Sequence, residues 1–392
     1  MHLVDTTLFY SPTSGGVRRY LNAKHEWYQT RGQERHSLLV PGTSTGLQPG
    51  DVSTIAGLIV PGTFNYRLPL APRRWAALLD ALQPDVIEAG DAFHPAWCAL
   101  KIAARRRIPA VAFFHSHLPR LVGIRCGDGI GRMAGRYLRW LYERFDLVFA
   151  PSRVMCDYLR SLGLSRVMLQ PLGVDVANFH PERRHAGLRR ELGLRDDVRL
   201  LAYAGRFSAE KNIGTLHDAF ARLGSGYHLL MVGGGERRRL TSNITMIPYH
   251  RDSRELAGVL ASADALVHAG TAETFGLVVL EAMACGRPVV GVRAAAVAEL
   301  VNEQVGVTAA RADGRLMAQA VRELYDRDIE SLGQAARRRV ESQYSWDHAL
   351  RQQLATYLVL SEKKRIVPEG WATASRAPSG DQQIMPAGPS SN

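Results

Sequence analysis

The chain has 392 residues, of which 46% are hydrophobic, and this length predicts two domains rather than one core. No apolar run approaches the roughly 20 residues that a membrane-spanning helix needs, so we do not expect an integral membrane protein. The N-terminus carries Asp5 and lacks a basic segment before its apolar residues, which argues against a secretory signal. Four scattered cysteines without CxxC spacing favour a reduced, cytoplasmic protein over a disulfide framework.

The formal net charge of +12 is concentrated in the first half of the chain. Residues 1–175 contain 21 Lys and Arg but only 13 Asp and Glu. This excess favours an acidic partner for that half, such as an anionic lipid surface or a phosphorylated acceptor. Nucleic acid ranks last, because the aromatic and basic patterns of the common nucleic-acid modules are absent.

The first strand candidate begins at Leu3 and leads into a loop that contains Gly15 and Gly16. A helix follows from about Arg18. The two glycines remove side chains where a phosphate could approach the N-terminus of this helix. Taken alone the signal is weak, because many strand–helix turns contain a pair of glycines.

Further along the first half, polar residues follow directly after strand candidates. Asp91 comes after a strand predicted over 84–88, and His115 and His117 come after a buried strand predicted over 108–114. Open α/β sheets bind ligands at the carboxyl ends of their strands. We therefore expect His115 to contact the acceptor or the transferred group, and Asp91 and His117 to contact the acceptor. The alternative is that these are ordinary hydrogen-bonded loop residues.

Residues 131–145 have the pattern of a basic amphipathic helix. Apolar and aromatic residues recur on one side at helical spacing: Met133, Tyr137, Trp140 and Leu141. Arginines surround them: Arg132, Arg136, Arg139 and Arg144. A helix of this kind suits a membrane interface. The alternative is an ordinary domain helix whose apolar side faces the core and whose arginines lie in water.

The second half begins with a strand predicted over 199–204, and two cations follow it. Arg206 can hold phosphate oxygens bidentately, and Lys211 adds a point charge. Both would neutralise the charge that develops on a departing diphosphate. The alternative is a pair of solvated surface cations.

Metal ligands are not evident in the sequence. Asp326 and Asp328 have the DxD form, but they fall in a polar helical stretch, and we interpret them as a solvated helix face. No other His, Cys, Asp and Glu cluster has metal-ligand spacing. We therefore expect neither a metal ion nor another cofactor.

The most informative stretch runs over 267–291 and reads strand, loop, helix, turn, strand. Glu273 lies in the loop, and Glu281 lies about two turns into the helix. Three backbone amides open the helix between them: those of Phe275, Gly276 and Leu277. Amides at a helix N-terminus bind anions such as phosphate. A carboxylate at either end of an anion site suits a nucleoside diphosphate sugar, although an ordinary βαβ unit with two solvated acids remains the alternative.

The segment from Glu273, ETFGLVVLEAMACGRPVV, resembles the E-x7-E motif of the retaining glycosyltransferases of family 4. Other segments fit this family and follow its order along the chain, over about residues 1–360. Gly15 and Gly16 resemble its donor-facing glycine loop. FHSHLP at 114–119 resembles the FHTH-type loop of lipid- and mannose-directed members. Arg206 and Lys211 resemble the pair that grips the donor diphosphate.

The resemblance implies an α/β protein of the GT-B fold, with two Rossmann-like domains facing a central cleft. The expected parts are an acceptor-side domain over 1–175, a nucleotide-sugar domain over 176–345, a helix crossing back over 346–364 and a disordered tail over 365–392. The implied reaction moves a hexose from a nucleoside diphosphate sugar to a hydroxyl with retention of configuration. His115 and Glu273 take the active-site positions, and Glu281 binds the ribose.

Two segments limit what the resemblance can tell. The loop at Tyr249 and His250 corresponds to a family segment that packs on the base largely through backbone groups. The donor could therefore be a UDP-, GDP- or ADP-sugar. Ala294 to Ala296 replace a glycine pair that the family often has before an acid, here Glu299, and this departure puts a donor contact there in doubt.

The acceptor is left open by the sequence. A lipid or lipid-linked glycan fits the basic first half, and would place a cytoplasmic protein on the inner face of the plasma membrane. One alternative is a transferase with a soluble small-molecule acceptor. Another is a non-catalytic protein that binds nucleotide sugars, although the presence of Glu273, Arg206 and Lys211 argues against it.

Overall fold

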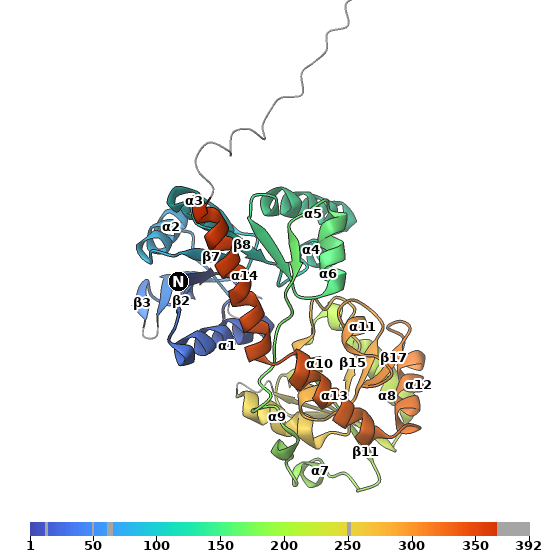
Figure 1. Cartoon of the computed structure of the whole chain (residues 1–392). Helices are drawn as coiled ribbons and strands as arrows, with labels where there is room; N and C mark the ends of the chain where they lie inside the picture. The colour runs from blue at the N-terminus through green and yellow to red at the C-terminus, as the bar shows by residue number, and fades with distance from the viewer. Residues whose placement is uncertain (12–14, 49–50, 61–65, 249–251, 367–392) are drawn as a thin grey trace, which may run out of the picture.

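The computed structural model describes residues 1–11, 15–48, 51–60, 66–248 and 252–366, which form two α/β domains joined by a long C-terminal helix (Figure 1). The strands of the first domain are β1 (His2–Thr6), β2 (Arg35–Gly42), β3 (Gly46–Gln48), β4 (Val52–Ala56), β5 (Leu58–Ile59), β6 (Arg67–Leu68), β7 (Val86–Ala89), β8 (Ala110–Phe113), β9 (Leu147–Ala150) and β10 (Val167–Leu169). Its helices are α1 (Gly16–Arg31), α2 (Pro72–Ala81), α3 (His94–Arg106), α4 (Leu118–Cys126), α5 (Asp128–Tyr142) and α6 (Arg153–Ser161).

The second domain and the crossing helix complete the described chain. The strands are β11 (Arg199–Ala204), β12 (Tyr227–Gly234), β13 (Arg238–Thr241), β14 (Ile244–Pro248), β15 (Ala265–His268), β16 (Val289–Val292) and β17 (Gly306–Ala309). The helices are α7 (Leu188–Glu191), α8 (Ile213–Leu223), α9 (Ser253–Ser262), α10 (Leu277–Ala284), α11 (Val297–Leu300), α12 (Gly314–Tyr325), α13 (Ile329–Gln343) and α14 (Trp346–Ile366).

Each domain contains one large, mostly parallel sheet. Within the described residues the first sheet has the order β10-β9-β8-β7-β1-β2-β4-β3, and the second has the order β13-β14-β12-β11-β15-β16-β17. Among the described strands of these two large sheets, only the edge strands β3 and β13 run antiparallel to their neighbours. The chain starts near the middle of each sheet and winds outward, which places a ligand crevice where the winding direction reverses. The predicted pair of Rossmann-like domains is confirmed.

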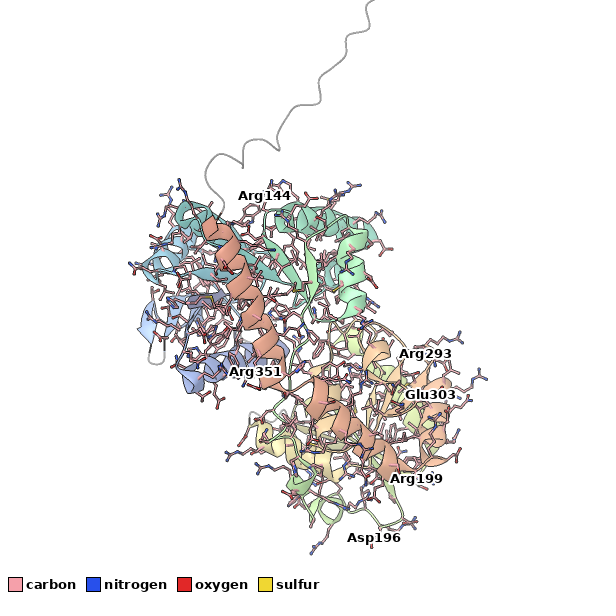
Figure 2. All side chains as sticks on the ribbon, viewed as in Figure 1. Arg144, Asp196, Arg199, Arg293, Glu303 and Arg351 are labelled. Atoms are coloured by element: carbon pink, nitrogen blue, oxygen red, sulfur yellow. The ribbon has the colours of Figure 1, made fainter. Side chains whose placement is uncertain are left out.

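The strands are apolar because both faces of each sheet are covered by helices. β8 (AVAF) and β9 (LVFA) supply Phe113 and Phe149, which are fully buried in the core of the first domain. In the second domain the central strand β11 buries Leu200 and Leu201 on opposite faces. Charged side chains project outward from both domains, for example Arg144 on the first and Arg199 on the second (Figure 2).

The two crossings between domains lie side by side. Val174 forms a parallel bridge with Ser345, and its amide donates to the carbonyl of Tyr344 at 2.8 Å. A Cβ at Gly173 would lie 2.6 Å from the backbone of Trp346, so this close approach requires glycine. The crossing helix α14 then runs back over α1 of the first domain (Figure 1). It ends at Ile366, slightly beyond the predicted end, and the predicted tail lies outside the described residues from 367 on.

Two sequence predictions about helices need correction. The family resemblance predicted a loop over 114–119, but α4 already begins at Leu118, with Pro119 in its first turn, where proline is well tolerated. Asp326 and Asp328 lie at the junction of α12 and α13, not on a helix face. Asp328 caps α13 by accepting from the amides of Glu330 and Ser331, both at 3.1 Å.

Candidate active site

A cavity of about 360 Å³ lies between the two domains. Most of the predicted site residues line it: Gly15, Gly16, His115, His117, Arg206, Lys211, Glu273, Phe275, Gly276, Leu277 and Glu281. Its volume is in the range of small-molecule sites. Tyr249 and His250 were predicted to contribute as well, but they lie outside the described residues.

Glu273 lies in the loop after β15 and is held from two sides. Its carboxylate forms an ion pair with the Lys211 ammonium and lies 3.0 Å from Nε2 of His268. Burial opposes ionisation of Glu273, but Lys211 and His268 outweigh it and hold its pKa well below the usual range. The carboxylate is therefore ionised at neutral pH and acts only as an acceptor, which suits the hydroxyls of a sugar.

His268 is a site residue that the sequence analysis did not predict. It is the last residue of β15, it is 1% exposed, and it supports the carboxylate of Glu273 from within the domain. Gly270 allows this arrangement, because a Cβ there would lie 2.6 Å from Cε1 of the His268 ring. Its position at the carboxyl end of a buried strand, just before Glu273, was the available signal.

Arg206 and Lys211 lie in the loop after β11, as predicted. The hydroxyl of Tyr203 donates to the carbonyl of Arg206 at 3.0 Å and fixes the backbone there. Asn212 donates from its side-chain amide to the carbonyl of Ala269 at 2.9 Å. This bond ties the Lys211 loop to the Glu273 loop, so the position of the ammonium relative to the carboxylate is set by the backbone.

The N-terminus of α10 faces the glycine loop of the first domain. Gly276 at the N-cap has φ of 91°, a conformation that glycine adopts without strain. No described side chain caps this helix. The amide of Val279 donates to the carbonyl of Gly276 at 2.9 Å, which leaves the amides of Leu277 and Val278 for a ligand or water. A Cβ at Gly16 would lie 3.3 Å from Leu277 Cδ1, which shows how closely the two domains approach.

Glu281 also contacts the first domain. It lies on α10 and is 2% exposed, and its Oε1 forms an ion pair with Arg19 of α1. Its Oε2 is buried and has no hydrogen-bond partner among the described residues. Arg19 lines the cavity but was not predicted, although its place one turn after the glycine pair was the available signal.

His115 reaches the cavity from the end of β8. Its ring stacks on Phe113 at 4.1 Å between centroids, and its Nε2 is buried without a partner in the described part of the chain. Burial, with a smaller contribution from Lys24, lowers the pKa of His115 to about 3. The imidazole is therefore neutral at physiological pH, and its Nε2 can donate a hydrogen bond to a ligand hydroxyl or accept one from it, according to the tautomer. The hydroxyl of Thr274 donates to the carbonyl of His115 at 2.8 Å across the cleft.

His117 and Asp91, both predicted to contact the acceptor, have structural partners. His117 lines the cavity, but its Nδ1 accepts from the amide of Arg120 at 3.2 Å and caps α4. Asp91 lies beside a smaller neighbouring cavity and not on the main one. Its carboxylate accepts from Thr7 at 2.9 Å and from the amide of Phe93 at 2.8 Å. Asp91 therefore holds the rim loops in this structure, and its expected contact with the acceptor stays a prediction.

Glu299 connects the domains without lining the cavity. Its carboxylate accepts from the amides of Arg153 at 2.9 Å and Val154 at 2.6 Å, which open α6 of the first domain. A carboxylate at a helix N-terminus is stabilised by the exposed amides and the helix dipole. The carboxylate of Glu299 is thus used within the protein, in the loop where the chain lacks the glycine pair that the family often has. In the described residues no group of three or more His, Cys, Asp or Glu is placed to hold a metal ion.

Comparison with known families and proteins places these features in context. Residues 14–178 match the family described as Glycosyltransferase Family 4, and residues 198–327 match Glycosyl transferases group 1. The GDP-mannose-dependent alpha-(1-6)-phosphatidylinositol dimannoside mannosyltransferase of Mycobacterium tuberculosis is 32% identical over 379 residues, covering 91% of this chain and 96% of that protein. The sulfoquinovosyl transferase SQD2 of Arabidopsis thaliana is 28% identical, covering 71% of this chain and 57% of that protein.

Solved structures have the same fold. Sucrose-phosphate synthase from Thermosynechococcus elongatus superimposes with a TM-score of 0.78 at 21% identity, covering 92% of this chain and 99% of that one. Anabaena HepE in complex with UDP and glucose has a TM-score of 0.72 at 18% identity, covering 91% and 99%. The chain therefore belongs to glycosyltransferase family 4, the retaining enzymes of the GT-B fold, and moves a hexose from a nucleoside diphosphate sugar to a hydroxyl of its acceptor.

Proposed function

We propose that this glycosyltransferase transfers mannose from GDP-mannose to a mannosylated phosphatidylinositol at an anionic membrane surface. The observation that carries the proposal is the end-to-end similarity to the Mycobacterium tuberculosis enzyme named for that donor and that class of acceptor, over 91% of this chain and 96% of that protein. The cavity between the domains supports it, because its acids and cations suit a donor with a hydroxyl-bearing group at each end and a diphosphate between them.

In this proposal the donor lies along the loop and helix that follow β15. Glu273 binds hydroxyls of the mannose, Glu281 binds the ribose, and Arg206, Lys211 and the first amides of α10 hold the diphosphate. These cations and amides stabilise the charge of the leaving group, so the reaction needs no metal ion. Neutral His115 accepts or donates one hydrogen bond to a hydroxyl of the mannose or the acceptor.

Transfer then exchanges one bond at the anomeric carbon for another on the same face of the sugar. The bond to the β-phosphate oxygen breaks, and the acceptor oxygen forms the new bond through an oxocarbenium-like state. The acceptor's hydroxyl proton passes to the departing phosphate oxygen. Glu273 is not assigned as a covalent nucleophile, because Lys211 and His268 both stabilise its ionised carboxylate and reduce its reactivity.

The α4–α5 hairpin is the surface proposed to meet the membrane. Its exposed apolar side chains include Ile124 at 55%, Met133 at 65% and Trp140 at 47%. Exposed arginines accompany them: Arg120, Arg125, Arg132 and Arg136. Apolar side chains among arginines suit the interface of an anionic bilayer. No helix in the described ranges is long and apolar enough to cross a membrane.

The contacts of α5 revise the set of residues predicted for this surface. The hydroxyl of Tyr137 donates to the carbonyl of Ala92 at 2.7 Å, and Leu141 is fully buried, so both belong to the domain core. On the neighbouring helix α4, Leu118 and Leu121 line the cavity. The surface is thus continuous with the acceptor side of the cleft, and an acceptor held in the bilayer could reach the donor.

The donor and acceptor are tested with purified protein and radiolabelled sugar nucleotides. GDP-mannose with phosphatidylinositol mannosides in vesicles should give a chloroform-soluble mannosylated product, whereas UDP-glucose and ADP-glucose should give none. Transfer from another donor would refute the choice of GDP-mannose. Binding of GDP-mannose with neither transfer nor hydrolysis would instead indicate a non-catalytic binding protein.

Membrane contact is tested by flotation with vesicles that contain phosphatidylinositol. The triple variant Arg125→Gln, Arg132→Gln and Arg136→Gln should lose most of its binding, because each cation near the surface contributes about 1 kcal/mol. A charge-matched control replaces exposed arginines of the second domain: Arg254→Gln, Arg315→Gln and Arg338→Gln. Equal binding by the two triple variants would exclude the α4–α5 surface.

A further inference from the structure

Arg19 occupies a position that the assigned donor contacts do not explain. It lies on the first turn of α1, three residues after Gly16, and it lines the cavity. Its guanidinium reaches across the cleft to Oε1 of Glu281 on α10, so the ion pair joins the two domains. The side chain of Arg19 is 28% exposed and that of Glu281 only 3%.

The ion pair and the ribose make competing demands on Glu281. A nearly buried carboxylate needs a compensating charge, and Arg19 supplies it in the structure. A ribose diol would offer Glu281 two hydrogen bonds but no charge. When the diol binds the carboxylate, the guanidinium has to share it or find another anion.

The donor itself brings that anion into the same cavity. Its diphosphate is expected at the first turn of α10, between Glu273 and Glu281. Lys211 is already paired with Glu273, so the cavity holds two cations that are neutralised by carboxylates, Lys211 and Arg19. A guanidinium released from Glu281 could bind phosphate oxygens bidentately, which an ammonium cannot do.

We propose that Arg19 is an exchanging donor-binding residue, which pairs with Glu281 before the donor binds and turns to the diphosphate when the ribose takes Glu281. The inference rests on the proposed ribose contact of Glu281. Because Arg19 belongs to the first domain, the exchange maintains a link across the cleft before and after binding. The exchange also couples the two halves of the donor, because the ribose binds Glu281 while the diphosphate binds the Arg19 that Glu281 releases.

The test separates the two halves of the ligand. Calorimetric titration of the wild type with GDP, UDP and ADP identifies the nucleoside diphosphate that binds, and the matching nucleoside is measured by displacement. Arg19→Gln should weaken the diphosphate about tenfold, which is about 1.4 kcal/mol. The affinity of this variant for the nucleoside should be unchanged or higher, because no ion pair has to be broken. Equal weakening of both ligands, or no weakening of the diphosphate, overturns the proposal.

Arg18→Gln is the matched control. Arg18 precedes Arg19 on the same helix and lies over the ring of Tyr10 at 5.9 Å, but it does not line the cavity. Its variant removes the same charge and should bind both ligands as the wild type does. If Arg18→Gln lost as much diphosphate affinity as Arg19→Gln, the loss would come from the positive charge of α1 as a whole and not from a contact of Arg19. That result would overturn the assignment.

Two further outcomes are distinguished by the same experiment. If Arg19→Gln does not fold, Arg19→Lys keeps the charge without the bidentate geometry and should weaken the diphosphate about threefold with no change for the nucleoside. Unchanged affinity of Arg19→Lys for the diphosphate then overturns the proposal. Wild-type binding of UDP or ADP in place of GDP contradicts the proposed donor but not the role of Arg19, whereas a wild type that binds none of the three overturns both.

Discussion

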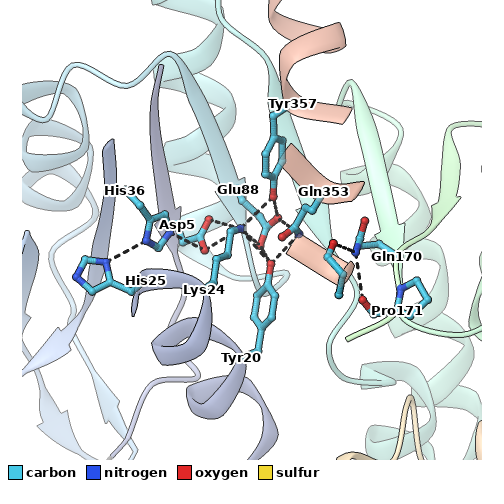
Figure 3. Close-up of polar contacts among 11 residues, drawn as sticks. Asp5, Tyr20, Lys24, His25, His36, Glu88, Gln170, Pro171, Gln353 and Tyr357 are labelled. Carbon is cyan, nitrogen blue, oxygen red and sulfur yellow. Dashed lines mark hydrogen bonds and ion pairs between the residues drawn. The ribbon is translucent and has the colours of Figure 1, made fainter. Parts of the chain in front are cut away.

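In the part of the chain that the structure describes, two clusters pair a lysine with one or more carboxylates at a strand end or in the loop after a strand, and they serve different purposes. Lys24 of α1 lies 3.0 Å from Asp5 and 3.2 Å from Glu88 inside the first domain (Figure 3). Lys211 pairs with Glu273 in the cleft of the second domain. The side chain of Lys24 is fully buried, whereas those of Lys211 and Glu273 are 17% and 16% exposed.

The surroundings of Lys24 use its hydrogen bonds within the protein. Its ammonium donates to the hydroxyls of Tyr20 and Tyr357, both at 3.0 Å. Gln353 donates to Glu88 at 3.1 Å, and Tyr357 donates to it as well. Since Gln353 and Tyr357 belong to α14, this cluster fastens the crossing helix to the first domain, as Figure 3 shows. The pair of Lys211 and Glu273, by contrast, keeps carboxylate oxygen accessible to a ligand. We call the buried cluster of Lys24, Asp5 and Glu88 the sealed cluster, and the pair of Lys211 and Glu273 the open cluster. Lysine–carboxylate pairing thus stabilises the fold in the sealed cluster and forms a binding site in the open cluster.

The largest expected effect is on catalysis, and it tests the open cluster. Glu273→Gln should lower kcat by about 10³-fold or more, equivalent to about 4 kcal/mol, because the charge that develops on the sugar loses its fixed counter-charge. The melting temperature should fall somewhat, because Gln keeps the size and one acceptor oxygen but loses the ion pair with Lys211. Mannosyl transfer at saturating donor measures the effect. A rate within tenfold of the wild type would remove Glu273 from the reaction.

Matched substitutions of the two lysines test the comparison directly. Lys24→Met leaves Asp5 and Glu88 buried without their cation and should lower the free energy of unfolding by about 3–5 kcal/mol. Lys211→Met should cost about 1 kcal/mol or less in stability but about 100-fold in kcat. Urea denaturation and steady-state kinetics on both variants measure the two quantities. If both variants lose stability equally, the distinction between sealed and open clusters fails.

The comparison also shows what could be read from the sequence. Glu273, Arg206 and Lys211 follow strands of a parallel sheet, and parallel topology brings strand ends to one edge, so their convergence was predictable. Both sheets were predictable from the alternation of apolar strands and helical patterns. The return of the last helix to the first domain was predicted from the family resemblance. Lys24 gave no such signal, because a lysine on an amphipathic helix is normally solvated and only the fold shows that it faces two acids.

Contacts between the domains were the least predictable part of the site. Arg19 and Glu281 are 262 residues apart, and no local pattern links a helix turn in one domain to a helix in the other. His268 ended a predicted strand, but its role depends on Gly270 leaving room for its ring. α4 was missed because its glycine, its proline and its exposed outer face resemble a loop more than a helix with a single apolar side.

The third prediction concerns the pH dependence of the sealed cluster. Burial raises the pKa of Glu88 to about 7 against the opposing effect of Lys24, and the charge of Asp5 adds to the rise. The folded protein thus binds a proton more tightly than the unfolded chain, and stability should fall as the pH rises from about 4.5 to about 7 and then level off. A shift of this size corresponds to roughly 3 kcal/mol at most.

Glu88→Gln isolates this contribution. The variant should lack the decrease between pH 4.5 and 7, while terms from His115 and His117, whose pKa values are lowered by burial, are common to both proteins and cancel in the difference. Glu273 has the opposite sign, because its depressed pKa adds stability that is lost only as the pH falls below about 4.5. The free energy of unfolding, measured by denaturation at each pH, is compared between wild type and variant. If the difference between the two stays constant from pH 4.5 to 7, the assignment is contradicted.

The smallest expected effect is on the contact between Glu299 and α6, which joins the domains outside the cavity. Glu299→Gln removes the charge at the N-terminus of α6 and should cost about 0.5–1 kcal/mol. Glu303→Gln, on the exposed loop after α11, is the charge-matched control and should cost almost nothing. Since Glu299 bonds only backbone of the first domain, its loss should favour opening of the cleft and raise the donor KM with kcat unchanged. A fall in kcat at constant KM would instead mean that Glu299 acts on the chemistry and not on the closure of the cleft.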